Sequence, residues 1–145
     1  MTRVLFVCIG NACRSQMAEA FARAYGSDVM IPASAGRAPA TRVSPTTISV
    51  MEEKHIDLSD HFPKALRHLS RAKFDLIIDM SGVPVPIEIQ APVRVWRVPD
   101  PVSMSYKDHC AIRDEIERLV MGLVFELRRG PLALPEPTTP SPQTP

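Results

Sequence analysis

The sequence predicts a single α/β domain in which a parallel β-sheet is covered by helices on both faces. Apolar, β-branched runs that suit buried strands alternate along the chain with segments of helical periodicity. Such alternation is typical of parallel sheets with crossover helices. The 145 residues are 45% hydrophobic, which is enough for one domain with a substantial core.

The first part of the chain predicts two strands and the helix between them. Residues 2–7 are apolar and β-branched, as in a buried strand. Residues 15–25 are rich in alanine and predict a helix that ends at Gly26. Residues 29–35 form a second, short strand. The apolar residues of the helix recur at four-residue spacing: Met17, Phe21 and Tyr25.

The next segment predicts two further helices. Ser44 suits an N-cap, and Pro45 after it suits the first position of a helix. Ile48 and Met51 give this helix an apolar stripe. A weaker helical pattern covers residues 64–72.

Two strands and a long helix complete the predicted domain. Residues 74–80 are apolar enough for a fully buried strand, and residues 93–98 form a fourth strand. The last helix ends at Gly130. Its apolar face is unbroken: Ile112, Ile116, Leu119, Val120, Leu123, Val124 and Leu127.

Residues 131–145 differ in character from the rest. Six of the chain's 15 prolines fall here, separated mainly by threonine, serine and glutamine. Such a segment cannot bury enough apolar surface to order itself. We therefore expect a catalytic domain over residues 1–130 and a disordered, proline-rich tail over residues 131–145.

Composition excludes several classes of function. The net charge of +1 predicts no general attraction to nucleic acid or to anionic membranes, and no apolar run is long enough to span a bilayer. The amino terminus begins a strand and lacks the features of a signal peptide. Three cysteines do not form a secreted disulfide framework, so we expect a cytoplasmic protein. We also expect a monomer. The histidines, like the rest of the sequence, indicate no metal site and no cofactor: His55, His61, His68 and His109.

The turn between the first strand and the first helix is the candidate active site. Cys8 ends the strand, and Arg14 follows six positions later at the start of the helix. Backbone N–H groups and the positive end of the helix dipole converge on such a turn and stabilise a thiolate there. The planar, permanently charged guanidinium of Arg14 suits the binding of an oxyanion. In this interpretation Gly10 permits tight backbone and Ser15 is the N-cap; a cysteine merely buried at a strand end is the alternative.

The candidate phosphate-binding loop consists of consecutive residues: Ile9, Gly10, Asn11, Ala12, Cys13, Arg14 and Ser15. Together with residues 4–8, Ser34-Ala35-Gly36 and Asp100-Pro101, this loop resembles the low-molecular-weight protein tyrosine phosphatase superfamily. That superfamily also contains arsenate reductases. The resemblance extends over residues 1 to about 129.

The resemblance implies a flavodoxin-like, three-layer domain with a four-stranded parallel sheet and the loop at its carboxyl edge. It also implies that Cys8 attacks the substrate, that Arg14 and the loop amides hold its oxygens, and that Asp100 protonates the leaving group. Ser15 would donate to the thiolate, and Asn11 would hold the shape of the loop. Cys13 is either a buried filler or the partner of Cys8 in a protective disulfide, and Cys110 is interpreted as structural.

The resemblance leaves two enzymatic functions open for this sequence, phosphate-ester hydrolysis and arsenate reduction. Gln16, where the phosphatases usually have proline, resembles the reductases, as do residues 50–59 and 113–116. Thioredoxin-linked reductases carry further cysteines after the third strand, and residues 79–84 contain none. We therefore expect a phosphohydrolase that forms a cysteinyl-phosphate and acts on a phosphorylated protein or a small phosphate ester.

The alternative is an arsenate reductase that uses the same loop with an external thiol, such as mycothiol, glutathione or thioredoxin. A second alternative is an inactive phosphoanion-binding module. The residues after the second strand, 37–43, contain no aromatic side chain that could line a phosphotyrosine slot. Trp96 is expected in the core.

Overall fold

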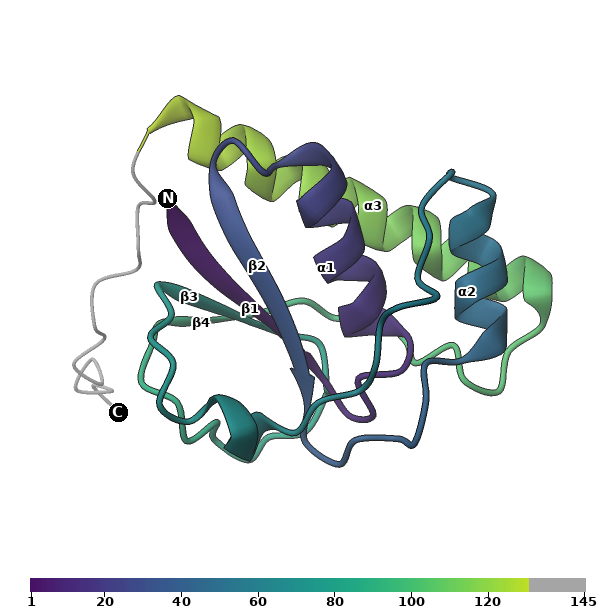
Figure 1. Ribbon diagram of the computed structural model, residues 1–145, viewed down its shortest axis with the longest axis horizontal. Coiled ribbons are helices and arrows are strands. Elements are labelled where there is room, and N and C mark those ends of the chain that lie inside the picture. The colour runs from purple at the N-terminus through teal and green to yellow at the C-terminus, as the bar shows by residue number, and fades with distance from the viewer. Residues whose placement is uncertain (131–145) are drawn as a thin grey trace, which may run out of the picture.

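The computed structural model describes residues 1–130, in which a β-sheet is packed against three α-helices (Figure 1). The predicted proline-rich tail lies outside the described residues. None of the helices in the described part is long and apolar enough to cross a membrane.

The sheet has four parallel strands, as the resemblance implies, and their order is β2-β1-β3-β4. β1 is Thr2–Cys8, β2 is Met30–Gly36, β3 is Leu76–Asp79 and β4 is Val93–Val95. The chain first moves from β1 to one edge of the sheet and then crosses back to β3 on the other side. The carboxyl ends of β1 and β3 therefore flank the point where ligands bind in open α/β sheets.

One face of the sheet is covered by α1 (Arg14–Tyr25) and α3 (Tyr106–Arg129), and α2 (Pro45–Glu52) packs against α3 (Figure 1). α2 begins as predicted, because the Ser44 side chain accepts a hydrogen bond from the backbone N–H of Thr47 and proline follows the cap. Side chains from every second position of β1 and β3 pack against these helices with no exposed surface: Val4, Phe6, Leu76 and Ile78.

The opposite face has a thinner cover. Leu5, Val7 and Ile77 pack there against the 3₁₀-helix η1, Leu66–Leu69, and against the loop between β3 and β4. The predicted helix over residues 64–72 was therefore wrong in type and length. Leu66 and Leu69 are three residues apart, which suits one 3₁₀ turn, and no second apolar row extends it.

The fourth strand is also shorter than predicted. β4 ends at Val95, and the amide of Trp96 makes one further hydrogen bond to the carbonyl of Asp79 over 3.0 Å before the chain leaves the sheet. Trp96 is partly buried and packs against Phe6, with the ring centroids 5.9 Å apart. The departure matters for the site described below, because it frees the carbonyl of Val98.

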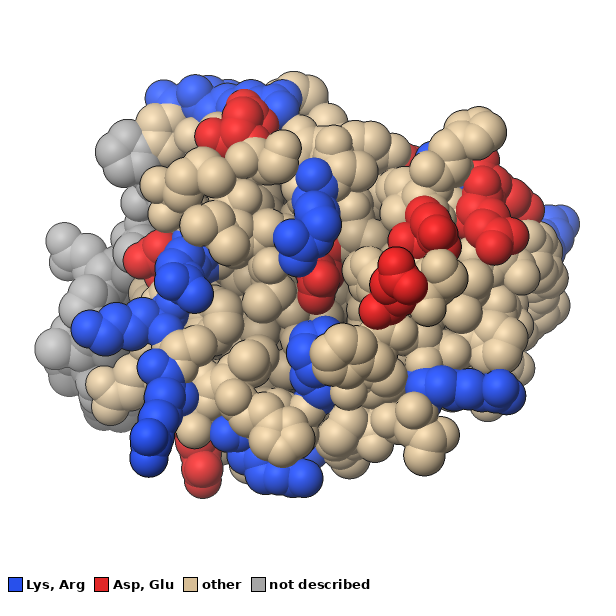
Figure 2. Space-filling view, viewed as in Figure 1, with Lys and Arg blue, Asp and Glu red and all other residues tan. Residues whose placement is uncertain are grey.

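Charge is distributed without a dominant sign on the face shown in Figure 2. Acidic side chains gather over α2 and the loop after it, while basic side chains are scattered across the rest of this face. This face therefore shows no broad surface of a single sign.

We expect Gly36→Ala to destabilise the protein by about 2 kcal/mol or more. Gly36 pairs with Cys8, and an added Cβ would lie 2.7 Å from the carbonyl oxygen of Ile9 and 2.9 Å from the backbone nitrogen of Asn11. Because both are backbone atoms, the loop itself would have to move. The measurement is denaturant unfolding.

The matched control for this prediction is Gly122→Ala in α3, where an added Cβ meets nothing within 4 Å. It should stabilise the protein by roughly 0.5–1 kcal/mol through helix propensity. Equal effects of the two substitutions would contradict the proposed crowding at Gly36.

Candidate active site

The candidate site lies in a pocket of about 210 Å³ at the carboxyl end of β1. Cys8 ends β1, α1 begins at Arg14, and the connecting residues curve around the pocket. Asp100 reaches it from the loop after β4. The pocket thus brings together the three predicted catalytic residues, and its lining is Cys8, Ile9, Gly10, Ala12, Cys13, Arg14, Ala40, Asp100 and Val102.

The loop between β1 and α1 is held by backbone hydrogen bonds from the segment after β2. The carbonyls of Cys8, Ile9, Gly10 and Ala12 accept from the amides of residues 37, 38, 40 and 44, over 2.9–3.1 Å. In a trans peptide the N–H group points away from the preceding carbonyl. The amides that follow these carbonyls therefore turn away from this ladder, and they suit the oxygens of a bound oxyanion.

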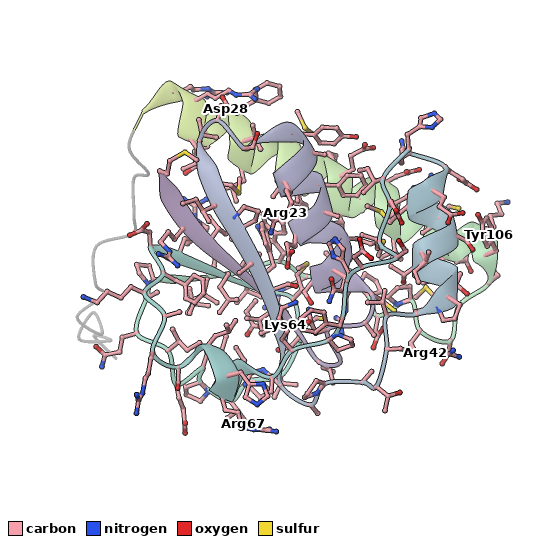
Figure 3. The ribbon with its side chains drawn as sticks, viewed as in Figure 1. Arg23, Asp28, Arg42, Lys64, Arg67 and Tyr106 are labelled. Atoms are coloured by element: carbon pink, nitrogen blue, oxygen red, sulfur yellow. The ribbon has the colours of Figure 1, made fainter. Side chains whose placement is uncertain are left out.

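Asn11 adopts a left-handed backbone conformation, with φ of 49°, and its side chain is completely buried. Its Oδ1 accepts from the backbone N–H of Lys64 (2.9 Å) and from Gln16 Nε2 (3.1 Å). Figure 3 shows Lys64 close to the carboxyl end of β2, where its carbonyl accepts from Gly36. Asn11 therefore ties the loop to a segment more than fifty residues away.

Ser15 lies between Asn11 and the candidate nucleophile. Asn11 Nδ2 donates to Ser15 Oγ over 2.7 Å, and Ser15 Oγ lies 2.8 Å from Cys8 Sγ. Because Ser15 already accepts from Asn11, its own O–H can donate to a Cys8 thiolate. The predicted role of Ser15 as N-cap was wrong: the cap position is Cys13, which makes no side-chain capping bond, and the hydroxyl is engaged with Asn11 and Cys8.

Arg14 is buried and fixed by carbonyls at the ends of two strands. Its Nη1 donates to the carbonyl of Met80 and, over 3.0 Å, to that of Val98. Its Nη2 lies 3.5 Å from Asp100 Oδ2. The side chain of Arg14 is 5% exposed and that of Asp100 is 41% exposed, so the carboxylate lies at the pocket rim.

Gln16 supports the loop in a way that the sequence did not reveal. Its side chain is completely buried; Nε2 lies 3.1 Å from the backbone oxygens of Asn11 and Phe62, and Oε1 lies 3.0 Å from His61 Nδ1. The sequence marked Gln16 only as a feature of the reductase branch. These partners are up to 46 residues away in the chain, so no local sequence pattern could predict the contacts.

The other two cysteines differ in surroundings. Burial raises the pKa of Cys13, and the hydroxyls of Thr47 and Ser44 form hydrogen bonds with its side chain. Cys110, on α3, is partly exposed and lies 3.8 Å from Glu53 Oε1. Among residues 1–130 no disulfide is present, and no group of three or more metal-ligating side chains could hold an ion.

Comparison with known proteins identifies the family. The pattern of the family described as low molecular weight phosphotyrosine protein phosphatase matches residues 3–85. The chain belongs to this family. Its arsenate reductase branch includes the glutaredoxin arsenate reductase of Synechocystis sp., which is 33% identical over 88% of this chain and 99% of its own length.

Two further relatives place the chain in the same branch. Arsenate reductase 1 of Bacillus cereus is 33% identical over 78% of this chain and 87% of its own length. A solved structure described as an arsenate reductase in the phosphate binding state has a TM-score of 0.80 and 31% identity, over 88% of this chain and 99% of that one.

These relatives overturn the expectation of a phosphohydrolase. The relatives at 31–33% identity over most of the chain are named arsenate reductases. The residues that favoured hydrolysis are a cysteine, an arginine and an aspartate around an oxyanion pocket. They suit either reaction, because phosphate and arsenate have the same charge and tetrahedral shape. The motif therefore specifies an oxyanion and does not choose between the two reactions.

The loop after β3 is fixed by Arg37, which directly follows β2 on the other side of β1. Arg37 donates to Ser81 Oγ (2.9 Å) and to the carbonyl of Val85 (2.6 Å), and it lies 3.3 Å from Asp79 Oδ2. In this family member, the position that carries cysteines in thioredoxin-linked reductases is therefore occupied by a hydrogen-bonded turn without a thiol.

We expect Ser15→Ala to slow alkylation of Cys8 by iodoacetamide about tenfold at neutral pH. The substitution removes a hydrogen bond to the thiolate, and bonds to charged groups contribute about 1.5–3 kcal/mol. Peptide mapping by mass spectrometry distinguishes Cys8 from the other thiols. Ser49→Ala, on the exposed side of α2, is the matched control and should leave the rate unchanged. An unchanged rate in Ser15→Ala would show that the hydroxyl does not stabilise the thiolate.

Proposed function

We propose that this protein is an arsenate reductase in which Cys8 is the nucleophile. The observation that carries the proposal is the similarity to relatives named arsenate reductases, at 33% identity over 78–88% of this chain. The pocket supports it, because a cavity of about 210 Å³ is lined by the buried Cys8 together with Arg14 and Asp100. None of the residues that line the pocket is aromatic, so none of them selects an aryl ester.

In the first step the Cys8 thiolate attacks arsenic. Arg14 and the loop amides hold the oxygens that remain, and Asp100 protonates the oxygen that leaves as water. Arsenic acid and the thiol thereby give a cysteinyl-arsenate and one water. Asp100 suits this role because it lies at the rim, next to Arg14 and to the pocket.

In the second step a second thiol attacks the sulfur of Cys8. The S–As bond breaks and leaves its electron pair on arsenic, which becomes trivalent, while the two sulfurs form a disulfide. Arsenic acid and two thiols then give arsenous acid, one disulfide and water. A thiol from outside the chain must finally reduce this disulfide. The name of the Synechocystis relative, glutaredoxin arsenate reductase, favours glutaredoxin as the source of electrons.

Cys8→Ser should abolish arsenate reduction and leave oxyanion binding within about threefold of wild type, because the cradle consists of backbone amides and Arg14. The measurements are NADPH consumption with arsenate, glutathione, glutaredoxin and glutathione reductase, and calorimetric titration with phosphate. Cys110→Ser, which lies outside the pocket, is the control and should keep full activity. Reduction by Cys8→Ser at a rate near that of wild type would contradict the assignment of the nucleophile.

Asp100→Asn should lower the rate of arsenate reduction by about 100-fold or more, because general acids contribute roughly 10²–10⁴. Loss of the negative charge beside Arg14 should at the same time tighten phosphate binding. Single-turnover arsenite formation and calorimetry measure the two effects. Asp60→Asn, at an exposed position, is the control. If Asp100→Asn has neither effect, the carboxylate is only part of an Asp-Pro turn.

A further inference from the structure

Three buried side chains beside the pocket have no part in the steps described so far: Cys13, Thr47 and His109. Cys13 is 4% exposed, Thr47 is completely buried, and His109 is 1% exposed. They come from the loop before α1, from the first turn of α2 and from the first turn of α3. Figure 1 shows α2 lying beside the start of α3.

These side chains form a continuous chain of contacts. The Thr47 hydroxyl is a hydrogen-bond partner of the Cys13 side chain. Its Oγ1 also lies 2.8 Å from His109 Nε2. While Cys13 is a thiol and Nε2 is unprotonated, the Thr47 hydroxyl can accept from Cys13 and donate to His109; when the thiolate forms, the same hydroxyl can donate to it, which lowers the pKa of Cys13. This arrangement connects a thiol to a base through one hydroxyl, in a place shielded from water.

Cys13 and Cys8 line the same 210 Å³ pocket, together with Arg14 and Asp100. Cys110 does not line it and lies instead beside Glu53. Of the chain's three cysteines, Cys13 is therefore the one placed to reach the sulfur of Cys8 while arsenic is attached.

We propose that Cys13 is the second thiol of arsenate reduction, and that Thr47 and His109 accept its proton as the Cys8–Cys13 disulfide forms. The inference rests on the proposed function. External thiols then reduce an internal disulfide of the protein, and they do not need to attack the arsenic adduct at the base of the pocket.

In this step the sulfur of Cys13 bonds to the sulfur of Cys8, and the proton of the Cys13 thiol passes through Thr47 to His109. The S–As bond breaks, and its electron pair stays on arsenic. The arsenite that leaves takes up one proton to become arsenous acid, which restores neutral His109. The cysteinyl-arsenate and one thiol thereby give one disulfide and arsenous acid.

The surroundings fit a base that acts only during this step. Burial lowers the pKa of His109, although the nearby Asp100 opposes the shift and Arg113 reinforces it, so the ring is neutral and able to accept a proton. Burial also gives Cys13 a net raised pKa: hydrogen bonds from the hydroxyls of Thr47 and Ser44 oppose the shift, and the charges of Asp100 and Cys8 add to it. The thiol therefore keeps its proton until its sulfur enters a disulfide.

The test is a single turnover of the full-length, reduced protein with arsenate, under anaerobic conditions and without added thiol. Wild type should release one arsenite per chain and lose two of its three free thiols. Peptide mapping should find the disulfide between Cys8 and Cys13. Cys110→Ser should behave as wild type, whereas Cys13→Ser should release no stoichiometric arsenite although it still binds phosphate.

The proton acceptor has its own test. Thr47→Val should slow arsenite release in the single turnover about 100-fold, in the range found for acid–base groups. Thr47→Ser retains the hydroxyl and should restore the rate, and both variants should bind phosphate as wild type does. A structural role for Thr47 would change phosphate binding along with the rate. Equal rates in the valine and serine variants would overturn the relay.

Two outcomes separate failure of this inference from failure of the proposed function. If wild type reduces arsenate only when glutathione and glutaredoxin are added, and Cys13→Ser does so equally well, the role of Cys13 is overturned and the protein is still a reductase. If wild type reduces no arsenate with any thiol, the proposed function fails and takes this inference with it.

Discussion

The site depends on the ladder that attaches residues 37–44 to the carbonyls of the loop before α1. A loop that binds an oxyanion needs its amides free, and its carbonyls must then be satisfied elsewhere. Here the backbone amides of residues 37, 38, 40 and 44, after β2, donate four hydrogen bonds to these carbonyls. Gly36 allows the two backbones to approach, since a Cβ there would lie 2.7 Å from the carbonyl oxygen of Ile9. The positions of Cys8, Asn11 and Arg14 all follow from this contact.

Arg14 shows how the sheet itself serves the site. A buried guanidinium needs partners, and Arg14 finds them in the carbonyls of Met80 and Val98, just beyond β3 and β4. A fourth strand that continued to residue 98 would commit that carbonyl to the edge of the sheet. Because β4 is short, the carbonyl of Val98 is free to accept a hydrogen bond from Arg14. Asp100, two residues further on, then lies beside the pocket for the same reason.

Sequence patterns predicted the parallel sheet, the strand–loop–helix turn and the cysteine and arginine of the pocket. These features depend on local periodicity and on the sequence of the turn. The aspartate that shares the pocket was expected only from the resemblance to the family. The patterns failed where contacts between residues far apart in the sequence determine the local structure. Ser15 looks like an N-cap, but its hydroxyl is engaged by Asn11 and Cys8. Thr47 and His109 are 62 residues apart, so nothing local connects them. The segment over residues 64–72 had too few apolar residues to define its type.

The choice between hydrolysis and reduction depends on what reaches the adduct, and the loop that forms the adduct is the same in both. Water that attacks the central atom expels the thiolate and leaves the oxidation state unchanged. A thiol that attacks the sulfur succeeds only if the central atom can keep the electron pair, which arsenic does by becoming trivalent and phosphorus in a phosphate does not. The position of a second thiol is therefore decisive. In this chain the loop after β3 is held by Arg37 and contains no cysteine, whereas Cys13 lies in the pocket wall. The reducing sulfur that we propose, that of Cys13, therefore lies within the loop between β1 and α1 and lines the same pocket as Cys8.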